Sequence, residues 1–162
     1  MECTLEQLTL MREQTLFGIP IQQTWTALFM LEKLITEQKF DIIFELGTGA
    51  GGLTRFFFGR CITVMSFDIK NGYDVFGSAV QLHIFKHSLD RKTMVFCDNG
   101  DKPREIKEYA PMLKKGDFIL GHDYRRPGGI PEDFDYESLG LETYNQNDWD
   151  RMQTYILCMR KK

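Results

Sequence analysis

Residues 44–52 read FELGTGAGG, and they continue directly from the apolar residues of FDIIF at 40–44. Such a short run of isoleucine and phenylalanine is typical of a strand buried in a parallel sheet. The glycines that follow permit a tight turn and let the backbone approach a ligand closely. A helix after that turn would direct its positive dipole end toward the same place. The stretch therefore predicts a strand–turn–helix unit with Glu45 beside a ligand.

The composition describes an ordinary globular chain. Its 162 residues suit one domain over residues 1–162, and the hydrophobic content of 43% and charged content of 27% are typical of soluble proteins. A net charge of −3 provides no basic field for nucleic acid or an acidic membrane. We therefore expect a small-molecule partner, no nucleic acid and no membrane.

Location and assembly are inferred from the same composition. No stretch approaches the roughly 18 consecutive apolar residues of a membrane span, and residues 1–14 lack the apolar core of a signal peptide. The four cysteines form no CxxC pair, which is typical of reduced thiols. These features predict a cytoplasmic protein, and its small size and exposed sheet edge make a homodimer an open alternative.

Apolar stretches alternate between the periods of strands and helices. Helical spacing follows Thr24, which could cap a helix reaching Lys39. Helices are also expected at 50–60 and 102–113, and strands at 40–46, 61–70, 80–86, 93–101, 114–124, 140–146 and 152–162, with 147–151 as the last turn. This alternation predicts an α/β fold: a minimal, Rossmann-like, doubly wound, mainly parallel sheet of about seven strands with an antiparallel C-terminal strand.

Polar residues follow four of the predicted strands, at the ends where ligands bind in such sheets. They are Glu45 to Gly52, Asp68, Cys97 to Asp101, and His122 to Tyr124. Glu45 would repel a pyrophosphate but accept bonds from a cation, and Asp68 could accept from ribose hydroxyls. S-adenosylmethionine has an ammonium, a ribose and no phosphate, so it fits better than a dinucleotide. The alternatives are a nicotinamide-dependent oxidoreductase and a glycine turn with solvated acids.

Two stretches resemble a known enzyme family. FELGTGAGG and the later FDIK (67–70) look like the first two motifs of class I S-adenosylmethionine-dependent methyltransferases. FCDNGDKPREIKEYAPMLKKGDFILGHDY (96–124) resembles a small-molecule subgroup related to the cephalosporin-hydroxylase-like methyltransferases. The resemblance covers roughly residues 19–126. It implies an enzyme with S-adenosylmethionine as cofactor, bound by Glu45, Gly47, Thr48, Gly49, Gly51, Asp68, Ser88 and Asp98.

The resemblance also implies which part of the cofactor each position meets. The glycine motif would hold the methionine part, Asp68 the ribose, and the residues around His87 and Ser88 the adenine. Asp98 would lie beside the methionine ammonium or the acceptor. Gln22, Gln23 and Trp25 precede or begin the first helix, where relatives present acceptor-side groups.

Asp98, His122 and Asp123 are the catalytic candidates for methyl transfer to a hydroxyl. His122 suits a general base, because the pKa of an unperturbed histidine lies near neutrality. The same three residues could instead bind a divalent metal, such as Mg²⁺, that lowers the pKa of the acceptor hydroxyl. Asp98 could also merely cap the following helix. The positive charges of Lys102 and Arg104 at that helix start fit either a solvated face or an acidic acceptor.

The segment between Asp68 and Asp98 is short for this family. It leaves room for one strand and at most a short helical turn. This shortening motivates the alternative that the chain is a cofactor- or metabolite-binding module without turnover.

Overall fold

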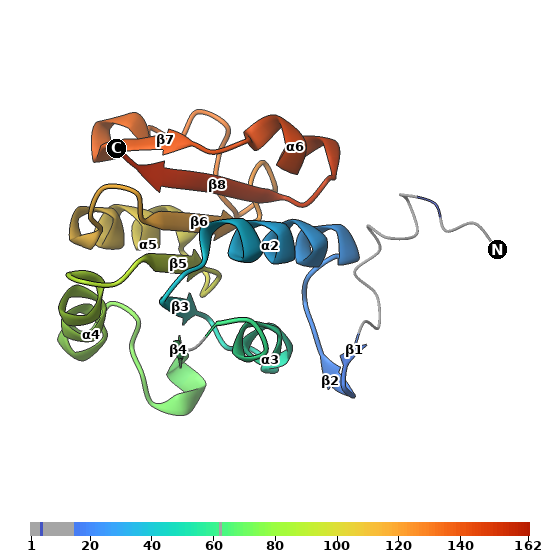
Figure 1. The fold of residues 1–162 in the computed structure, drawn as a ribbon, viewed down its shortest axis with the longest axis horizontal. Coiled ribbons are helices and arrows are strands. Elements are labelled where there is room, and N and C mark those ends of the chain that lie inside the picture. Colours follow the sequence, from blue (N-terminus) through green and yellow to red (C-terminus); the bar gives the residue numbers. More distant parts are fainter. Residues whose placement is uncertain (1–3, 5–14, 62) are drawn as a thin grey trace.

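A six-stranded sheet forms the centre of the computed structural model, which describes residues 4, 15–61 and 63–162 (Figure 1). Its strand order is β4-β3-β5-β6-β8-β7. The strands are β3 (Ile42–Leu46), β4 (Thr63–Phe67), β5 (Thr93–Cys97), β6 (Phe118–His122), β7 (Leu141–Thr143) and β8 (Ile156–Lys161). The first four in this order run parallel, and β8 runs antiparallel to both β6 and β7. The predicted mainly parallel sheet with an antiparallel C-terminal strand is confirmed.

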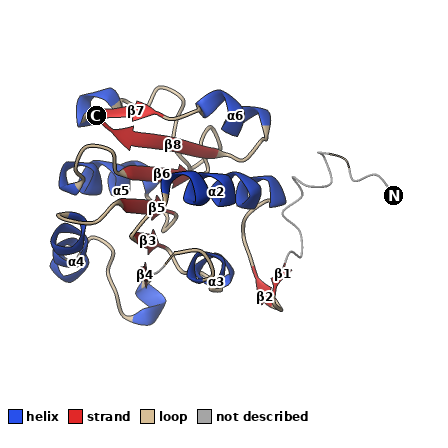
Figure 2. Ribbon diagram, viewed as in Figure 1, coloured by secondary structure: helices blue, strands red, loops and turns tan. Residues whose placement is uncertain are grey.

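Helices cover both faces of the sheet (Figure 2). One core packs α2 (Trp25–Gln38), α3 (Gly52–Phe58) and α6 (Gln146–Arg151) against one face. The other core packs α4 (Ser78–Ser88) and α5 (Lys102–Tyr109) against the opposite face. Three short 3₁₀ turns complete the connections: η1 (Ile69–Asn71), η2 (Ala110–Met112) and η3 (Glu137–Leu139). This is the doubly wound arrangement that the alternating pattern predicts.

The central strands are apolar because both of their faces are buried. Every residue of β3, β5 and β6 is buried. Side chains alternate between the two cores, so that Ile43 belongs to the α2 side and Ile42 and Phe44 to the α4 side. Glu45 has the parity of Ile43 and therefore points toward the layer that contains α3. A continuous apolar run thus marks a strand covered on both sides.

A small hairpin lies over the start of α3. It consists of β1 (Thr15–Leu16) paired antiparallel with β2 (Ile19–Pro20). A Cβ added to Gly52 would lie 2.3 Å from the carbonyl oxygen of Pro20. The glycine is therefore needed for the hairpin to pack directly on the helix, and the hairpin leads the chain past the polar end of the sheet into α2.

The predicted strand at residues 80–86 is wrong, because this segment belongs to α4. Val80, Ile84 and Ser88 are the buried positions of that helix, and their spacing of four is the helical period. Leu82 and Phe85 are apolar but exposed, so the apolar residues of this segment do not keep to one helix face. The sheet consequently has six strands where about seven were predicted, and β4 is its edge.

The last predicted turn is also wrong. Residues 147–151 lie in α6, whose Trp149 is buried in the α2 core. Asparagine and aspartate dominate this segment and suggest a turn from composition alone. The single large aromatic side chain fixes it as a helix by packing.

The predictions on cysteines, membrane spans, a signal peptide and assembly also came from composition. Cys97 and Cys158 are buried free thiols, as expected for reduced cysteines, and Cys61 is buried as well. Within the described part of the chain, no helix has the length and apolarity to cross a membrane. The prediction that residues 1–14 are not a signal peptide lies outside the described residues, except for Thr4. The homodimer stays a prediction.

Candidate functional site

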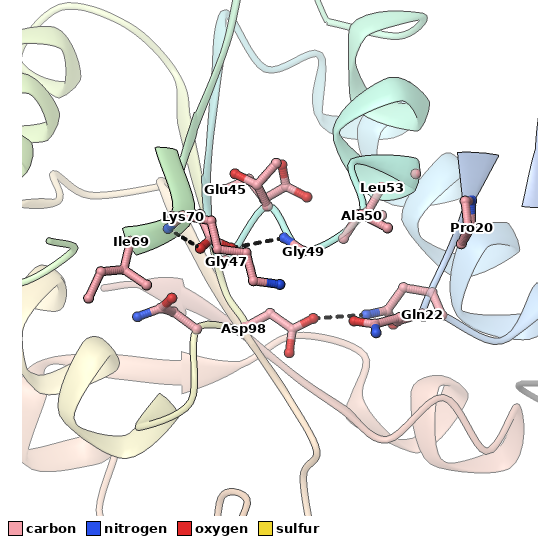
Figure 3. A pocket seen from close by; sticks show the side chains of 15 residues that line it. Pro20, Gln22, Glu45, Gly47, Gly49, Ala50, Leu53, Ile69, Lys70 and Asp98 are labelled. Atoms are coloured by element: carbon pink, nitrogen blue, oxygen red, sulfur yellow. Dashed lines mark hydrogen bonds between the residues drawn. The ribbon is translucent and has the colours of Figure 1, made fainter. Parts of the chain in front are cut away.

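The polar strand ends gather around one cavity. Its volume is about 270 Å³, close to the lower end of the ~300–1,000 Å³ typical of ligand pockets. The carboxyl ends of β3, β4 and β5 meet the start of α3 there (Figure 3). Six of the predicted cofactor-binding residues line it: Glu45, Gly47, Thr48, Gly49, Asp68 and Asp98. The crevice beyond the strand ends is where open α/β sheets bind ligands.

The glycine turn has the backbone conformation that only glycine adopts without strain. Gly47, Gly49 and Gly51 have φ angles of 104°, 55° and 87°. A Cβ on Gly47 would lie 2.4 Å from the carbonyl oxygen of Asp98. Gly47 also donates its N–H to the carbonyl of Phe67. The turn is therefore wedged between the ends of β4 and β5, while Gly51 precedes α3 without lining the cavity.

Glu45 is a fully buried carboxyl group with one unused oxygen. Its Oε2 accepts hydrogen bonds of 2.5 Å from the hydroxyls of Thr54 and Ser66, while Oε1 has no protein partner. Burial raises the pKa of Glu45 to about 7; the two hydroxyl donors oppose that rise, and the charges of Asp98 and Asp68 add to it. A buried oxygen without a partner at a cavity indicates a ligand that donates or carries positive charge.

Asp68 stabilises the glycine turn and faces the same cavity. Its Oδ2 accepts from the N–H of Gly49 at 3.0 Å and its Oδ1 from that of Lys70 at 2.9 Å. Burial opposes ionisation, but these backbone donors and the charge of Lys70 outweigh it and hold the pKa of Asp68 below its usual value. Ile69, the next residue, is 74% exposed and lines the cavity. A charged acceptor and an apolar surface thus lie side by side.

Asp98 connects the cavity to the end of β6. Its Oδ1 lies 3.0 Å from Nδ1 of His122, and its Oδ2 accepts from Nε2 of Gln23 at 3.2 Å. Because an ionised carboxylate only accepts hydrogen bonds, Nδ1 carries the hydrogen and Nε2 is the basic nitrogen of the ring. Gln23 is buried, and its Oε1 has no protein partner. Asp98 does not cap α5, whose N-cap is Asp101.

Lys102 and Asp123 complete the polar cluster. Nζ of Lys102 donates to Oδ2 of Asp123 at 3.0 Å and lies 3.7 Å from Oδ1 of Asp98. Ligand-capable atoms of Asp98, His122 and Asp123 all lie within 4.8 Å of one another. The structure therefore brings together the three predicted catalytic residues. The reading of Lys102 as part of a solvated helix face is wrong, since this side chain is buried.

The pKa shifts within this cluster show how the charges support one another. Burial opposes the ionisation of Asp123, but the proximity of His122 and the hydrogen bond from Lys102 outweigh it and lower its pKa. Burial likewise opposes the charge of Lys102, and its bond to Asp123 with the nearby Asp98 reverses that effect and raises its pKa. Both side chains are consequently charged at neutral pH.

Two other predictions fall outside the cavity. Ser88 ends α4, where its buried hydroxyl donates to the carbonyl of Met112 at 3.1 Å. Because residues 80–86 form a helix and not a strand, Ser88 lies before β5 and does not follow a strand end. Ser88 therefore does not line the cavity. Arg104 stacks on the ring of Phe76 at 3.8 Å, away from the polar cluster.

Sequence reasoning undervalued Lys102, although a signal was present. A cation in the first turn of a helix opposes the dipole and needs a compensating partner. Of the three residues expected on the acceptor side, Gln22 and Gln23 line the cavity and Trp25 does not; their acceptor-side role stays a prediction. Nothing in the sequence indicates that Oε1 of Gln23 lacks a protein partner.

Comparisons with known proteins identify the fold. No family model matches the chain, and no curated protein matches it. A solved structure described as "CmcI-N160 apo-structure" aligns with a TM-score of 0.61 at 16% identity, covering 91% of this chain and 76% of that one. Another, described as "cmcI-N160 SAH", aligns with a TM-score of 0.60 at 14% identity, covering 91% and 81%. The predicted resemblance to cephalosporin-hydroxylase-like methyltransferases is thereby confirmed at the level of the fold.

Proposed function

We propose that the cavity binds S-adenosylmethionine and that the protein transfers its methyl group to the hydroxyl of a small molecule. The carrying observation is the buried oxygen of Glu45 that lacks a protein partner. Together with Asp68 and Asp98 it makes the lining acidic, which suits a cationic ligand without phosphate. The solved structure "cmcI-N160 SAH" supports this reading, because SAH abbreviates S-adenosylhomocysteine, the demethylated cofactor.

The lining residues match the chemical parts of this cofactor. Glu45 and the free oxygen of Gln23 would accept bonds from the methionine ammonium. Asp68 would accept from the ribose hydroxyls, since a carboxylate has about four acceptor positions and backbone donors do not fill them all. The exposed side chain of Ile69 offers an apolar surface to the adenine ring. When bound, the cofactor supplies a methyl group activated by its sulfonium.

His122 would act as the general base for the acceptor. Its Nε2 takes the hydroxyl proton as the oxygen attacks, and Asp98 holds the ring by accepting from Nδ1. Gln23 fixes the second oxygen of Asp98, so the carboxylate is oriented from both sides. The negative charge of Asp98 also stabilises the imidazolium that forms, as in other carboxylate–histidine pairs.

The donor set of this cluster does not fit Mg²⁺. That ion prefers octahedral oxygen ligands, whereas one of the three ligands here is an imidazole. The ammonium of Lys102 already lies against the two carboxylates. We therefore assign proton removal to His122 and no step to Mg²⁺.

The test is methyl transfer from labelled S-adenosylmethionine across a panel of small hydroxyl compounds. The amide of His122→Asn can still donate to Asp98 from about the position of Nδ1, but it cannot act as a base. Turnover should therefore fall by roughly 10²–10⁴-fold. Binding of S-adenosylhomocysteine should change little. If His122→Asn turns over at the wild-type rate, the assignment of the base is wrong.

A binding module without turnover is the second candidate. The observation that favours it is the short connection from β4 to β5, which holds the single helix α4 and leaves β4 at the sheet edge. S-adenosylhomocysteine binding without methyl transfer to any compound of the panel would favour this candidate. A nicotinamide enzyme is disfavoured by Glu45, and competition between the two cofactors separates the cases.

A further inference from the structure

The cluster at the ends of β5 and β6 contains its own cation. Two carboxylates and an imidazole, from Asp98, Asp123 and His122, present their ligand atoms within 4.8 Å of one another. Such a set resembles a site for a divalent transition metal, because imidazole is a better ligand for transition metals than for Mg²⁺. The side chain of Lys102 reaches the same carboxylates and is only 10% exposed.

Lys102 is held there by the fold. It begins α5 four residues after Asp98, so one turn of chain brings Nζ to 3.7 Å from Oδ1 of Asp98. From the other strand, Asp123 accepts its hydrogen bond at 3.0 Å. The ammonium therefore bridges β5 and β6 at the point where both strands end.

The backbone at Asp123 is shaped to present this carboxylate. Its φ of 59° is in the left-handed region, which is uncommon for a residue other than glycine. Ile130 donates its N–H to the carbonyl of Asp123, and a Cβ on Gly129 would lie 2.0 Å from that oxygen. A tight loop thus holds Asp123 in this conformation.

The charges decide what the cluster can bind. The carboxylates of Asp98 and Asp123 face the ammonium of Lys102, and the positive charge of Arg126 also acts on Asp123. A divalent ion would have to displace the ammonium or approach it closely, and repulsion between cations opposes both.

We propose that the ammonium of Lys102 is the resident cation of this cluster and takes the place of a divalent metal. Lys102 is then a positioning residue. It prevents metal ions from solution from binding to Asp98 and Asp123, and so leaves His122 free to act as a base. The catalytic part of this inference rests on the proposed function. The exclusion of metal does not rest on the proposed function, because it follows from the contacts of Lys102 with Asp98 and Asp123.

Titration with Mn²⁺, followed by the electron paramagnetic resonance of the free ion, tests the exclusion directly. Lys102→Met should gain one Mn²⁺ site at least about 100-fold tighter than any in the wild type, because it leaves two partly buried carboxylates uncompensated. Lys102→Arg keeps the cation and should resemble the wild type. Lys115→Met, an equal charge change at an exposed position, should also resemble it.

A second metal identifies the ligands. Co²⁺ bound to Lys102→Met should show a visible absorption band that changes when His122 is also replaced by alanine, and binding should be lost with Asp123→Asn. Should Lys102→Met fail to fold, the wild type still decides: it should bind Mn²⁺ no more tightly than Asp123→Asn.

Two outcomes would overturn the proposal. One is a wild-type Mn²⁺ site that Asp123→Asn abolishes, and the other is a folded Lys102→Met that binds no more tightly than the wild type. Calorimetry with S-adenosylhomocysteine on the same samples separates this result from the cofactor assignment. A chain that binds the cofactor and Mn²⁺ at this cluster refutes only the role of Lys102.

Discussion

Replacing Glu45 by glutamine should make the cofactor-free protein more stable at alkaline pH. Glu45 is fully buried, and its pKa is raised to about 7, from an ordinary value of 4.5. The folded chain therefore holds a proton that the unfolded chain releases between these two values. Stability from this group is present at acid pH and is lost as pH rises toward 7. Glutamine keeps an oxygen for Thr54 and Ser66 but has no charge to bury.

The size of the effect follows from the pKa of about 7 for Glu45 in the folded chain. The raised pKa of Glu45 lowers the free energy of unfolding by about 1 kcal/mol at about pH 5 and by about 3 kcal/mol at about pH 8. Glu45→Gln should thus gain up to about 2 kcal/mol in unfolding free energy, relative to the wild type, between these conditions. Its affinity for S-adenosylhomocysteine should fall, because the ammonium loses its anionic partner.

Urea denaturation at the two pH values measures this difference. Glu137→Gln serves as the control, since it removes an equal charge at an exposed position and should leave the pH dependence of the wild type unchanged. Equal pH slopes for Glu45→Gln and the wild type would refute the reasoning. So would tighter binding of S-adenosylhomocysteine by the variant.

Two further substitutions test the surroundings of Glu45 and the glycine turn. Thr54→Val removes a hydroxyl donor from Glu45, which should raise its pKa further and weaken S-adenosylhomocysteine binding at neutral pH by roughly tenfold; calorimetry should find that Thr54→Ser retains the affinity. Gly47→Ala places a Cβ 2.4 Å from the carbonyl of Asp98 at a positive φ, so denaturation should show a loss of about 2–5 kcal/mol, and a wild-type melting temperature would contradict the predicted clash.

The strands around the cavity were predictable because their sequences carry a strong physical signal. Residues 42–44 form an unbroken apolar run, and every residue of β3 is buried. The glycines after it mark a turn, and at Gly47 an added Cβ would clash with the carbonyl of Asp98. The position of Asp68 at the next strand end followed from the same alternation.

What the sequence did not disclose depends on contacts between distant residues. Residues 80–86 are a short apolar run, whose period fits a helix or a strand, and only packing of Val80 and Ile84 decides it. Lys102 meets Asp123 across two strand ends, which local composition does not encode. Gln23 reaches Asp98 over 75 positions of chain, so this hydrogen bond appears only once the sheet is assembled.

Isothermal calorimetry with S-adenosylhomocysteine tests the central claim most directly. The wild type should bind one molecule per chain, and Asp68→Ala should weaken binding roughly 10–100-fold, because it removes a charged acceptor. Asp68→Asn, which can still accept from the N–H of Gly49, should fall between them. A folded wild type that releases no heat at millimolar S-adenosylhomocysteine would contradict the account.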